Sequence, residues 1–599
     1  MDSYKESIFE PLEYYINYGK ETHNRNVSEH FESLVKKSGV DENQNKATVK
    51  KYYDTKKQIE LLKKKITRNK IFRALSIVAS VILFLITVPI SQNFSDALKV
   101  ILPLLALALG IFVIILTFRL TKKKLAALSE ALKKQESAAL KLLSEAEAQM
   151  APLNALFSDS DTFTLIEKTL PQTKFDKQFL FENLEDLKNG YGFNGIFGNK
   201  SSVLDVVSGK LYKNPFLFER ALNEEVGSHT YTGTLVISWT EYGRDSKGRT
   251  VRRRRTQTLV ATVTKPKPVY NVTTLLSYGS QAAPDLCFSR ENRHYEDFSE
   301  KQVEREVRRG ARKLKKKAEK ALSAGKSFTE MSNTRFDTLF DASNRDNEQQ
   351  FRIMFTPLAQ REMIDLIRSE AGYGDDFDFF KRKKLNVIRS EHSQSWDMNT
   401  SASRYRSFDL EKSRKTFIDF NNEYFKSVYF DFAPLIAIPA YQDAPTKTFE
   451  EVSHPDLSYT EYNYETIANK IGTDKFAHER TATQAILKTE LVTRSGGFDT
   501  VAVTAYSYSA ENRTDFVPKL GGDGRIHSVP VHWIEYIPQQ KTTLMTVKNI
   551  GLSETEYSAK TNSVASAIIP ENATCYKGIF AHTGMPAQSL ANFINTITK

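Results

Sequence analysis

The stretches ALSIVASVILFLITVPI, from Ala74 to Ile90, and VILPLLALALGIFVIILTF, from Val100 to Phe118, decide the fold. Neither contains a charged residue. Each approaches the roughly 20 apolar residues with which a helix crosses a hydrocarbon core of about 30 Å. The 14 Leu, Ile, Val or Phe residues of the second stretch favour insertion by about 6 kcal/mol, at about 0.4 kcal/mol each. The sequence therefore predicts a transmembrane helical hairpin. The alternative is a pair of buried core helices.

The residues around this hairpin predict its orientation. The connector from Ser91 to Lys99 carries one Lys and one Asp, which predicts a tight turn just outside the bilayer. Both outer flanks are basic, with Lys56, Lys57, Lys63, Lys64, Lys65, Arg68 and Lys70 before it and Arg119, Lys122, Lys123, Lys124, Lys133 and Lys134 after it. Positive residues next to membrane helices favour the cytoplasmic side, so we expect both termini in the cytoplasm.

Both membrane helices are expected to continue into a helical stalk. Residues at spacings of three and four form a heptad seam after the second span: Leu125, Leu128, Leu132, Gln135, Ala139, Leu142, Ala146 and Gln149. Tyr52, Ile59, Leu62 and Ile66 follow a similar spacing before the first span. An antiparallel pair ending at Ala151-Pro152 is the simplest packing. Packing on the soluble part, or self-association through the stalk helices, remains open.

Composition limits what the rest of the chain can be. A chain of 599 residues predicts roughly three or four structural units. The two cysteines, Cys287 and Cys575, are far apart and form no CxxC, which excludes a disulfide framework and a cysteine zinc site. The formal net charge of +12 points to an anionic partner, although basic flanks of membrane helices contribute to it.

Helical and strand patterns alternate after the stalk without a regular βαβ rhythm. The predicted fold class is therefore a membrane-anchored α+β protein with mixed helix-and-sheet domains in the cytoplasm. We expect N-terminal helices and the first stalk helix in residues 1–70, the transmembrane hairpin in 71–118 and the second stalk helix in 119–150. A cytoplasmic α+β domain is expected in 151–390, and a C-terminal sheet-containing domain in 391–599, after the polar segment 391–408.

An arginine-rich β-hairpin is the first candidate binding element. Alternating Thr, Val, Leu and Trp predict strands at Thr230–Tyr242 and Arg249–Thr264, joined by a Gly-bounded linker. Its end carries Arg244, Lys247, Arg249, Arg252, Arg253, Arg254 and Arg255. Consecutive residues of a strand point to opposite faces, so the four adjacent arginines cannot all be buried. They must lie in solvent or contact a polyanion.

A basic helix from Glu300 to Leu322 is the second candidate binding element. Val303, Val307, Ala311, Leu314, Ala318 and Leu322 form its narrow apolar face. Most other positions are basic: Arg305, Arg308, Arg309, Arg312, Lys313, Lys315, Lys316, Lys317 and Lys320. One interpretation is contact with anionic lipid headgroups. The preferred interpretation is packing on its own domain, because the apolar face has no aromatic residue.

Motifs that would indicate catalysis or metal binding do not meet their requirements. The glycine-rich segment from Asn189 to Ser201 lacks the phosphate-loop spacing, because Asn199 separates Gly198 from Lys200. Asp375, Asp376 and Asp378 lack the calcium-loop pattern and read as mutually repelling carboxylates on a loop. The ten histidines include no HExxH. The sequence thus predicts no catalytic residue, no metal site and no cofactor.

The stretch FDTLFDASNRDNEQQFRIMFTP, from Phe336 to Pro357, with the helix through Met363 and Ile367 that follows it, carries a resemblance. Residues 50–390 resemble a bacterial membrane-protein family known as a domain of unknown function. The resemblance implies two N-terminal membrane helices, a cytoplasmic α+β domain and a place in the bacterial inner membrane. It brings no active-site residues with it.

The hypothesis that these features favour is a non-enzymatic binding or scaffold protein anchored to the bilayer. Its basic hairpin and basic helix would contact lipid headgroups or an acidic protein. A second hypothesis is a membrane-bound enzyme whose active site is assembled from distant residues. A third, nucleic-acid binding, is disfavoured because no aromatic residue is interleaved with Arg252 to Arg255.

Overall fold

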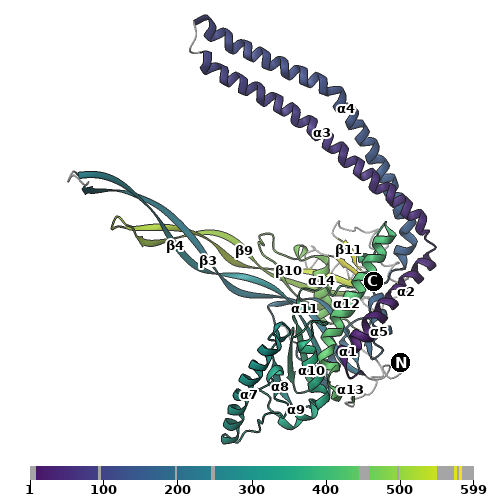
Figure 1. The fold of residues 1–599 in the computed structure, drawn as a ribbon. Coiled ribbons are helices and arrows are strands. Elements are labelled where there is room, and N and C mark those ends of the chain that lie inside the picture. Colours follow the sequence, from purple (N-terminus) through teal and green to yellow (C-terminus); the bar gives the residue numbers. More distant parts are fainter. Residues whose placement is uncertain are drawn as a thin grey trace. The chain divides into compact units, whose positions relative to one another are not determined.

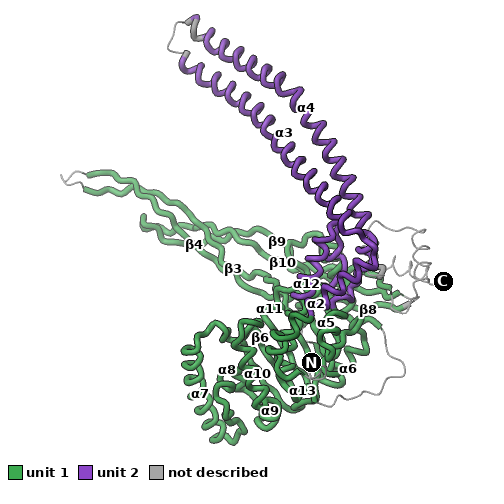
Figure 2. The backbone as a smooth tube through the Cα atoms, turned by 45° about the vertical axis from the view of Figure 1, so that its right-hand side comes forward, with its two compact units in different colours: residues 1–22, 163–399, 424–599 green, residues 23–162, 400–423 purple. Residues whose placement is uncertain are grey.

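The computed structural model describes residues 8–91, 96–195, 198–244, 250–443, 458–495, 498–548, 573–576 and 579–582. Two compact units divide the chain (Figure 2). Unit 1 contains residues 1–22, 163–399 and 424–599, and unit 2 contains residues 23–162 and 400–423. Each unit therefore combines segments that are distant in the sequence. The domain boundaries inferred from the sequence stay predictions.

Two long helices dominate unit 2 (Figure 1). They are α3, Glu42–Ser91, and α4, Asp96–Leu156, and the turn expected between them falls at residues 92–95, outside the described residues. Both are long and apolar enough to cross a membrane. The stalk does not end at Ala151-Pro152 as expected, because α4 contains Pro152 and continues to Leu156.

The residues of the predicted seam lie on a covered side of α4, while the coiled-coil stalk itself stays a prediction. α3 and α4 contact each other, and all eight predicted seam residues of α4 are buried or half-buried. Ala146 is fully buried, and on α3 Ile59 is 8% exposed. Because side chains three and four apart share one helix face, the sequence spacing correctly located the contact stripe.

The membrane-length segments of α3 and α4 differ in polarity between the side where the two helices meet and the side that faces outward. Large apolar side chains point away from the pair; Leu85 is 61% exposed and Leu105 is 62% exposed. Small and polar residues lie between the helices instead. Ser76 Oγ lies 3.1 Å from Thr117 Oγ1, and Ser80 Oγ donates to the Gly110 carbonyl at 3.2 Å. This distribution is the reverse of the one in a water-soluble helix pair.

Aromatic side chains form a core in unit 2, away from the membrane-length segments of α3 and α4. Phe31 of α2, Lys20–Ser38, packs with Phe417 of α12, Leu410–Ile436, and with Phe157. Arg414 of α12 forms ion pairs with Glu32 at 3.0 Å and Glu42 at 3.2 Å. The part of α12 beyond residue 423 belongs to unit 1.

Unit 1 is built on a seven-stranded antiparallel sheet in the order β1-β2-β3-β4-β7-β6-β5. The strands are β1 Thr173–Phe175, β2 Ser201–Leu211, β3 Asn214–Arg244, β4 Thr250–Gly279, β5 Cys287–Arg290, β6 Phe377–Arg382 and β7 Leu385–Ser390. The mixed helix-and-sheet class predicted from the sequence is confirmed for the described residues.

Helices cover both faces of this sheet. α6, Phe181–Tyr191, and α14, Glu461–Ile471, lie on one face, where Leu187 and Leu217 share a core with Phe179 and Tyr462. On the other face Phe432 of α12 packs against Phe216 and Phe218, at ring-centroid distances of 5.0 and 5.4 Å. The shorter helices are α1 Pro11–Tyr14, α5 Asp161–Thr169, α8 Thr334–Phe340, α9 Glu348–Met354, α10 Pro357–Arg368, α11 Glu391–Gln394 and α13 Pro439–Asp443.

A second sheet has the order β10-β9-β8. Its strands are β8 Ile486–Ser495, β9 Phe498–Leu520 and β10 Ile526–Lys548, and β11 Ala573–Tyr576 pairs with β12 Ile579–His582. Val501, Val503 and Met545 form its core with α14. β10 is one continuous strand, because it remains paired with β9 from Ile526 to Lys548.

The outer parts of two β-hairpins form an arm within unit 1 (Figure 1). We define the arm as residues 230–244 and 250–264 of the β3–β4 ribbon with residues 511–535 of the β9–β10 ribbon. Ile237, Leu259, Ala261, Val529 and Val531 form a core between the ribbons. At Gly233 any side chain would collide with the Pro530 carbonyl, so the two backbones come into close contact there.

Candidate functional site

The arginine-rich hairpin predicted from the sequence is the outer end of the β3–β4 ribbon. The two strands stay paired up to Arg244 and Thr250. Arg244, Arg252, Arg253, Arg254 and Arg255 are all exposed. Lys247 and Arg249, the other predicted site residues of this hairpin, lie outside the described residues.

The four consecutive arginines point to both faces of the ribbon. Gln257 and Leu259 face the β9–β10 ribbon, so the strand alternation puts Arg253 and Arg255 on that same face and Arg252 and Arg254 on the other. Arg255 Nε donates to Glu241 Oε2 at 2.8 Å, in a pair with both side chains more than half exposed. Such an exposed pair contributes little to stability, so these arginines are not explained by the needs of the fold.

A polar contact also joins the two ribbons at the inner boundary of the arm, next to residue 264. Lys265 Nζ lies 2.7 Å from Asp515 Oδ2 and 4.1 Å from the centre of the Trp533 ring. Trp533 Nε1 donates to Asp515 Oδ1 at 2.9 Å. The sequence predicted the β3–β4 hairpin but not this packing, because the contacting residues are more than 200 positions apart.

The predicted basic helix is α7, Glu300–Ser323. Val303, Leu314 and Ala321 are buried, and Leu314 and Ala321 pack with Phe328. At Gly310 an added side chain would collide with Thr338 of α8, which shows how closely the two helices approach. α7 therefore packs on its own domain through the apolar stripe. Leu322, predicted within that stripe, is 81% exposed instead, because Ala321 occupies the buried position.

The basic residues of α7 remain available to solvent. Arg308, Arg309, Arg312, Lys313, Lys315, Lys316 and Lys317 are all exposed. A shallow groove is lined by Arg305, Arg308, Arg309, Arg312, Lys313 and Lys316. Both views show α7 and the end of the arm at separate places in unit 1, so the structure does not join the two predicted basic elements into one site (Figures 1 and 2).

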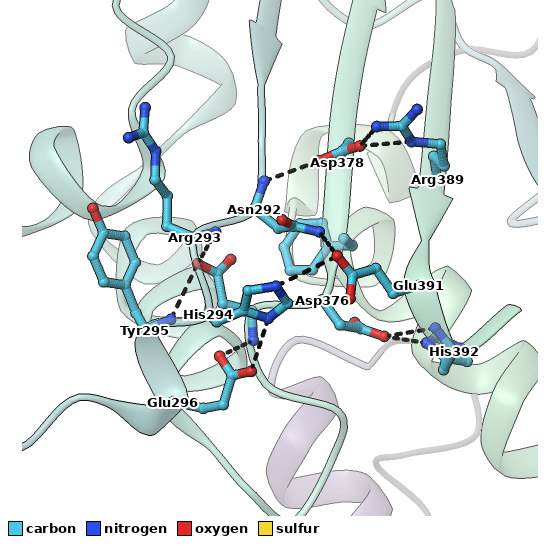
Figure 3. A network of polar contacts seen from close by, with 12 residues as sticks. Asn292, Arg293, His294, Tyr295, Glu296, Asp376, Asp378, Arg389, Glu391 and His392 are labelled. Atoms are coloured by element: carbon cyan, nitrogen blue, oxygen red, sulfur yellow. Dashed lines mark hydrogen bonds and ion pairs between the residues drawn. The ribbon is translucent and has the colours of Figure 1, made fainter. Parts of the chain in front are cut away.

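The acidic segment beside β6 corrects an expectation from the sequence. Asp375, Asp376 and Asp378 do not repel one another on a loop, because each is buried and has a partner. Figure 3 shows Asp376 and Asp378 with their partners. Arg290 forms a fully buried ion pair with Asp375, and Asp378 accepts from Arg389 Nε at 2.7 Å. Compensation by arginines that are distant in the sequence makes the burial of these carboxylates possible.

His392 is the partner of Asp376. Its Nδ1 lies 2.5 Å from Asp376 Oδ2, and its Nε2 lies 3.6 Å from Asp431 Oδ1. Burial by itself lowers the pKa of His392, but the charges of Asp431 and Asp376 outweigh burial and raise that pKa above its ordinary value. The Tyr373 ring stacks on the imidazole at 3.9 Å. His392 thus links α11 to α12, since its Nε2 lies 3.1 Å from the Ser427 carbonyl oxygen and close to Asp431.

These polar groups act as internal connections rather than as an open reaction centre. Asn292, which follows β5, donates to Asp378 of β6 and to Glu391 of α11, each at 2.9 Å, and so joins these elements (Figure 3). Among the described residues, no group of three or more His, Cys, Asp or Glu side chains is arranged to hold a metal ion.

Glu219 is an exception among the buried carboxyl groups. It lies near the start of β3, it is 0% exposed, and neither carboxyl oxygen has a hydrogen-bond partner among the described residues. Burial raises the pKa of Glu219 to about 8, so the group is neutral at pH 7. Sequence reasoning missed it, because Glu219 is an ordinary position of an alternating strand.

Comparisons with protein-family models, curated proteins and solved structures give no match. The resemblance of residues 50–390 to a bacterial two-helix membrane family therefore stays a prediction. The arguments about function depend on the chain's own geometry.

Proposed function

We propose that the chain is a membrane-anchored binding protein of the bacterial inner membrane. In this proposal α3 and α4 cross the bilayer as two spans, both termini lie in the cytoplasm, and unit 1 binds an anionic partner. Lipid headgroups and an acidic protein surface share the chemistry that the exposed arginines recognise.

The single observation that carries the anchor is the reversed polarity of the α3–α4 pair. The large apolar side chains are each more than half exposed at Leu75, Leu85, Leu105 and Phe112. The polar side chains of Ser76, Ser80 and Thr117 instead make hydrogen bonds between the two helices. In water this arrangement would leave a large apolar surface solvated, at a cost of about 25 cal/mol per Å². In lipid the same surface is matched by the solvent, and small residues favour close helix packing.

The binding role is supported by the exposed basic groups of unit 1. The described ends of β3 and β4 hold five arginines against the single carboxylate of Glu241. The exposed side of α7 is mostly basic from Lys301 to Lys320, with Glu304 and Glu319 as exposed carboxylates among the basic residues. Near an anionic membrane surface each such residue contributes about 1 kcal/mol of attraction. Unit 1 would therefore bind anionic surfaces with a strength that falls as salt rises.

Alkaline carbonate extraction combined with topology mapping tests this proposal. The full chain, expressed in a bacterial host, should stay in the membrane pellet after the wash. Cysteines placed at Ser91 and at Lys134 should react with an impermeant maleimide from opposite sides of the membrane. Release of intact protein into the supernatant, or labelling of both positions from the same side, would contradict the two-span anchor.

A further inference from the structure

The outer face of the β9–β10 ribbon is apolar at its end. Val517, Val529 and Val531 face the β3–β4 ribbon, so the residues that alternate with them point away from it. Among these, Phe516 is 67%, Leu520 is 69% and Ile526 is 73% exposed. Leu520 pairs directly with Ile526 across the strands. We name Phe516, Leu520 and Ile526 the apolar patch.

This apolar patch is confined to the outermost part of the ribbon. Further inward, the same outer face carries Thr514 and His532, with Thr514 Oγ1 at 2.8 Å from His532 Nδ1, and then Asn512, which pairs with the half-buried Ile534. A solvent-facing side of an antiparallel ribbon is ordinarily polar, as it is at Thr514 and His532. The change from polar to apolar toward the end therefore calls for a partner at the end of the arm.

Arginines begin where the β9–β10 ribbon stops. Its turn is fixed to the other ribbon, because the Gly522 amide donates to Gln257 Oε1 at 2.7 Å. Trp239 still packs against Gly522, and beyond it the β3–β4 ribbon continues alone from Thr240 to Arg244. Arg253 and Arg255 project on the side of the covered face, and Arg252 and Arg254 project on the other, next to Tyr242, which is 70% exposed.

The distribution of charge favours a bilayer over a protein as the occupant. A folded protein partner presents one surface and would contact one face of a two-stranded ribbon. A layer of lipid headgroups surrounds an inserted element, and it can bind arginines on both faces at once. An aromatic ring and aliphatic side chains next to basic residues are also the composition of elements that lie in the membrane interface.

We propose that the end of the arm is a membrane-inserting element for an anionic bilayer. The apolar patch enters the boundary between headgroups and acyl chains, and Arg252 to Arg255 bind lipid phosphates around it. This inference rests on the proposed function and names the anionic partner of the arm as lipid. Burying each large side chain of the patch strengthens binding about tenfold, so replacing all three with serine weakens it about a thousandfold.

An environment-sensitive dye at position 526 tests the insertion. The full chain carries C287S and C575S, and Ile526→Cys is labelled with a nitrobenzoxadiazole dye. One sample is reconstituted into nanodiscs that contain phosphatidylglycerol. Another is placed in phosphatidylcholine nanodiscs and mixed with phosphatidylglycerol vesicles. We expect a blue-shifted, brighter emission in at least one of them, and no change with phosphatidylcholine alone. An unshifted emission in both samples overturns the proposal.

The matched control carries the dye at Asn512→Cys, which lies on the same face but in its polar part. This position should not respond, because only the end of the arm enters the interface. An equal response at both positions would indicate that the whole arm is buried in another way and would overturn the insertion.

The triple variant F516S/L520S/I526S separates this inference from the proposed function. If this variant bound phosphatidylglycerol vesicles at the wild-type level and in a salt-sensitive way, insertion would be overturned and anionic binding would stay intact.

The dye-labelled chain without these serine substitutions gives the opposite separation. Its release by carbonate, with a dye that still responds to lipid, would overturn the two-span anchor and leave insertion intact. Capture of the arm by an acidic protein, without any dye response to lipid, would also count against a lipid partner.

Discussion

Arginines have opposite surroundings in the edge strand β5 of the seven-stranded sheet and at the end of the arm. Arg290 is fully buried, and its guanidinium is paired with the equally buried Asp375. Arg252 and Arg253 are exposed and have no carboxylate partner among the described residues. The comparison teaches that this chain uses charge in two ways. Paired and buried charge joins distant segments of the fold, whereas unpaired and exposed charge remains available for a partner.

The largest expected effect comes from breaking a buried pair. Replacing Arg290 with methionine leaves Asp375 as a buried, unpaired carboxylate, which should lower the free energy of unfolding by roughly 3–5 kcal/mol. The three tryptophans, Trp239, Trp396 and Trp533, all belong to unit 1, so urea titration followed by their fluorescence reports on this unit.

The exposed pair of the arm provides the matched control for this experiment. Arg255→Met removes the partner of Glu241, but it should change stability by less than about 1 kcal/mol, because both side chains are well solvated. If the two substitutions cost the same, the distinction between the two groups of arginines fails.

An effect that depends on pH is expected at Glu219, the buried carboxyl group without a partner among the described residues. Below its ordinary pKa of 4.5 the group is protonated in both states and has no effect on the pH dependence. As the pH rises, the unfolded chain ionises first, so the wild type loses stability until the pH passes the folded value of about 8. Glu219→Gln should remove this loss, and its stability relative to wild type should rise by about 1 kcal/mol per pH unit between these values.

The same urea titration, repeated across this pH range, measures the effect. Glu465→Gln is a useful comparison, because Glu465 is buried but accepts a hydrogen bond from Lys488 at 3.0 Å and therefore has a partner to lose. A difference between Glu219→Gln and wild type that does not vary with pH would show that Glu219 is already ionised in the folded chain.

Local patterns allowed much of this architecture to be predicted from the sequence. The spacing of Leu128, Ala139 and Ala146 identified the side of α4 that contacts α3, since a 3.6-residue period links sequence directly to a helix face. Alternation in Thr230–Tyr242 identified the arm's hairpin in the same way. Such periodic signals need no knowledge of what lies opposite.

The pairing of distant segments could not be predicted in this way. Asp375 and Arg290 are 85 positions apart, and their contact depends on the order of β5, β6 and β7 in the sheet. From the sequence alone, the neighbouring aspartates read as mutual repulsion. The apolar patch escaped notice for a similar reason, because Phe516 and Leu520 look like core residues until the packing of the ribbons shows which face is covered.

Binding to anionic vesicles by the full chain in phosphatidylcholine nanodiscs tests the central claim most directly. The quadruple variant with Arg252 to Arg255 replaced by serine should bind phosphatidylglycerol vesicles at least about a hundredfold more weakly at low salt. Its stability should change by less than about 1 kcal/mol, and replacement of the same residues by lysine should retain most binding. Wild-type affinity in the serine variant, unchanged across the salt range, would contradict the account.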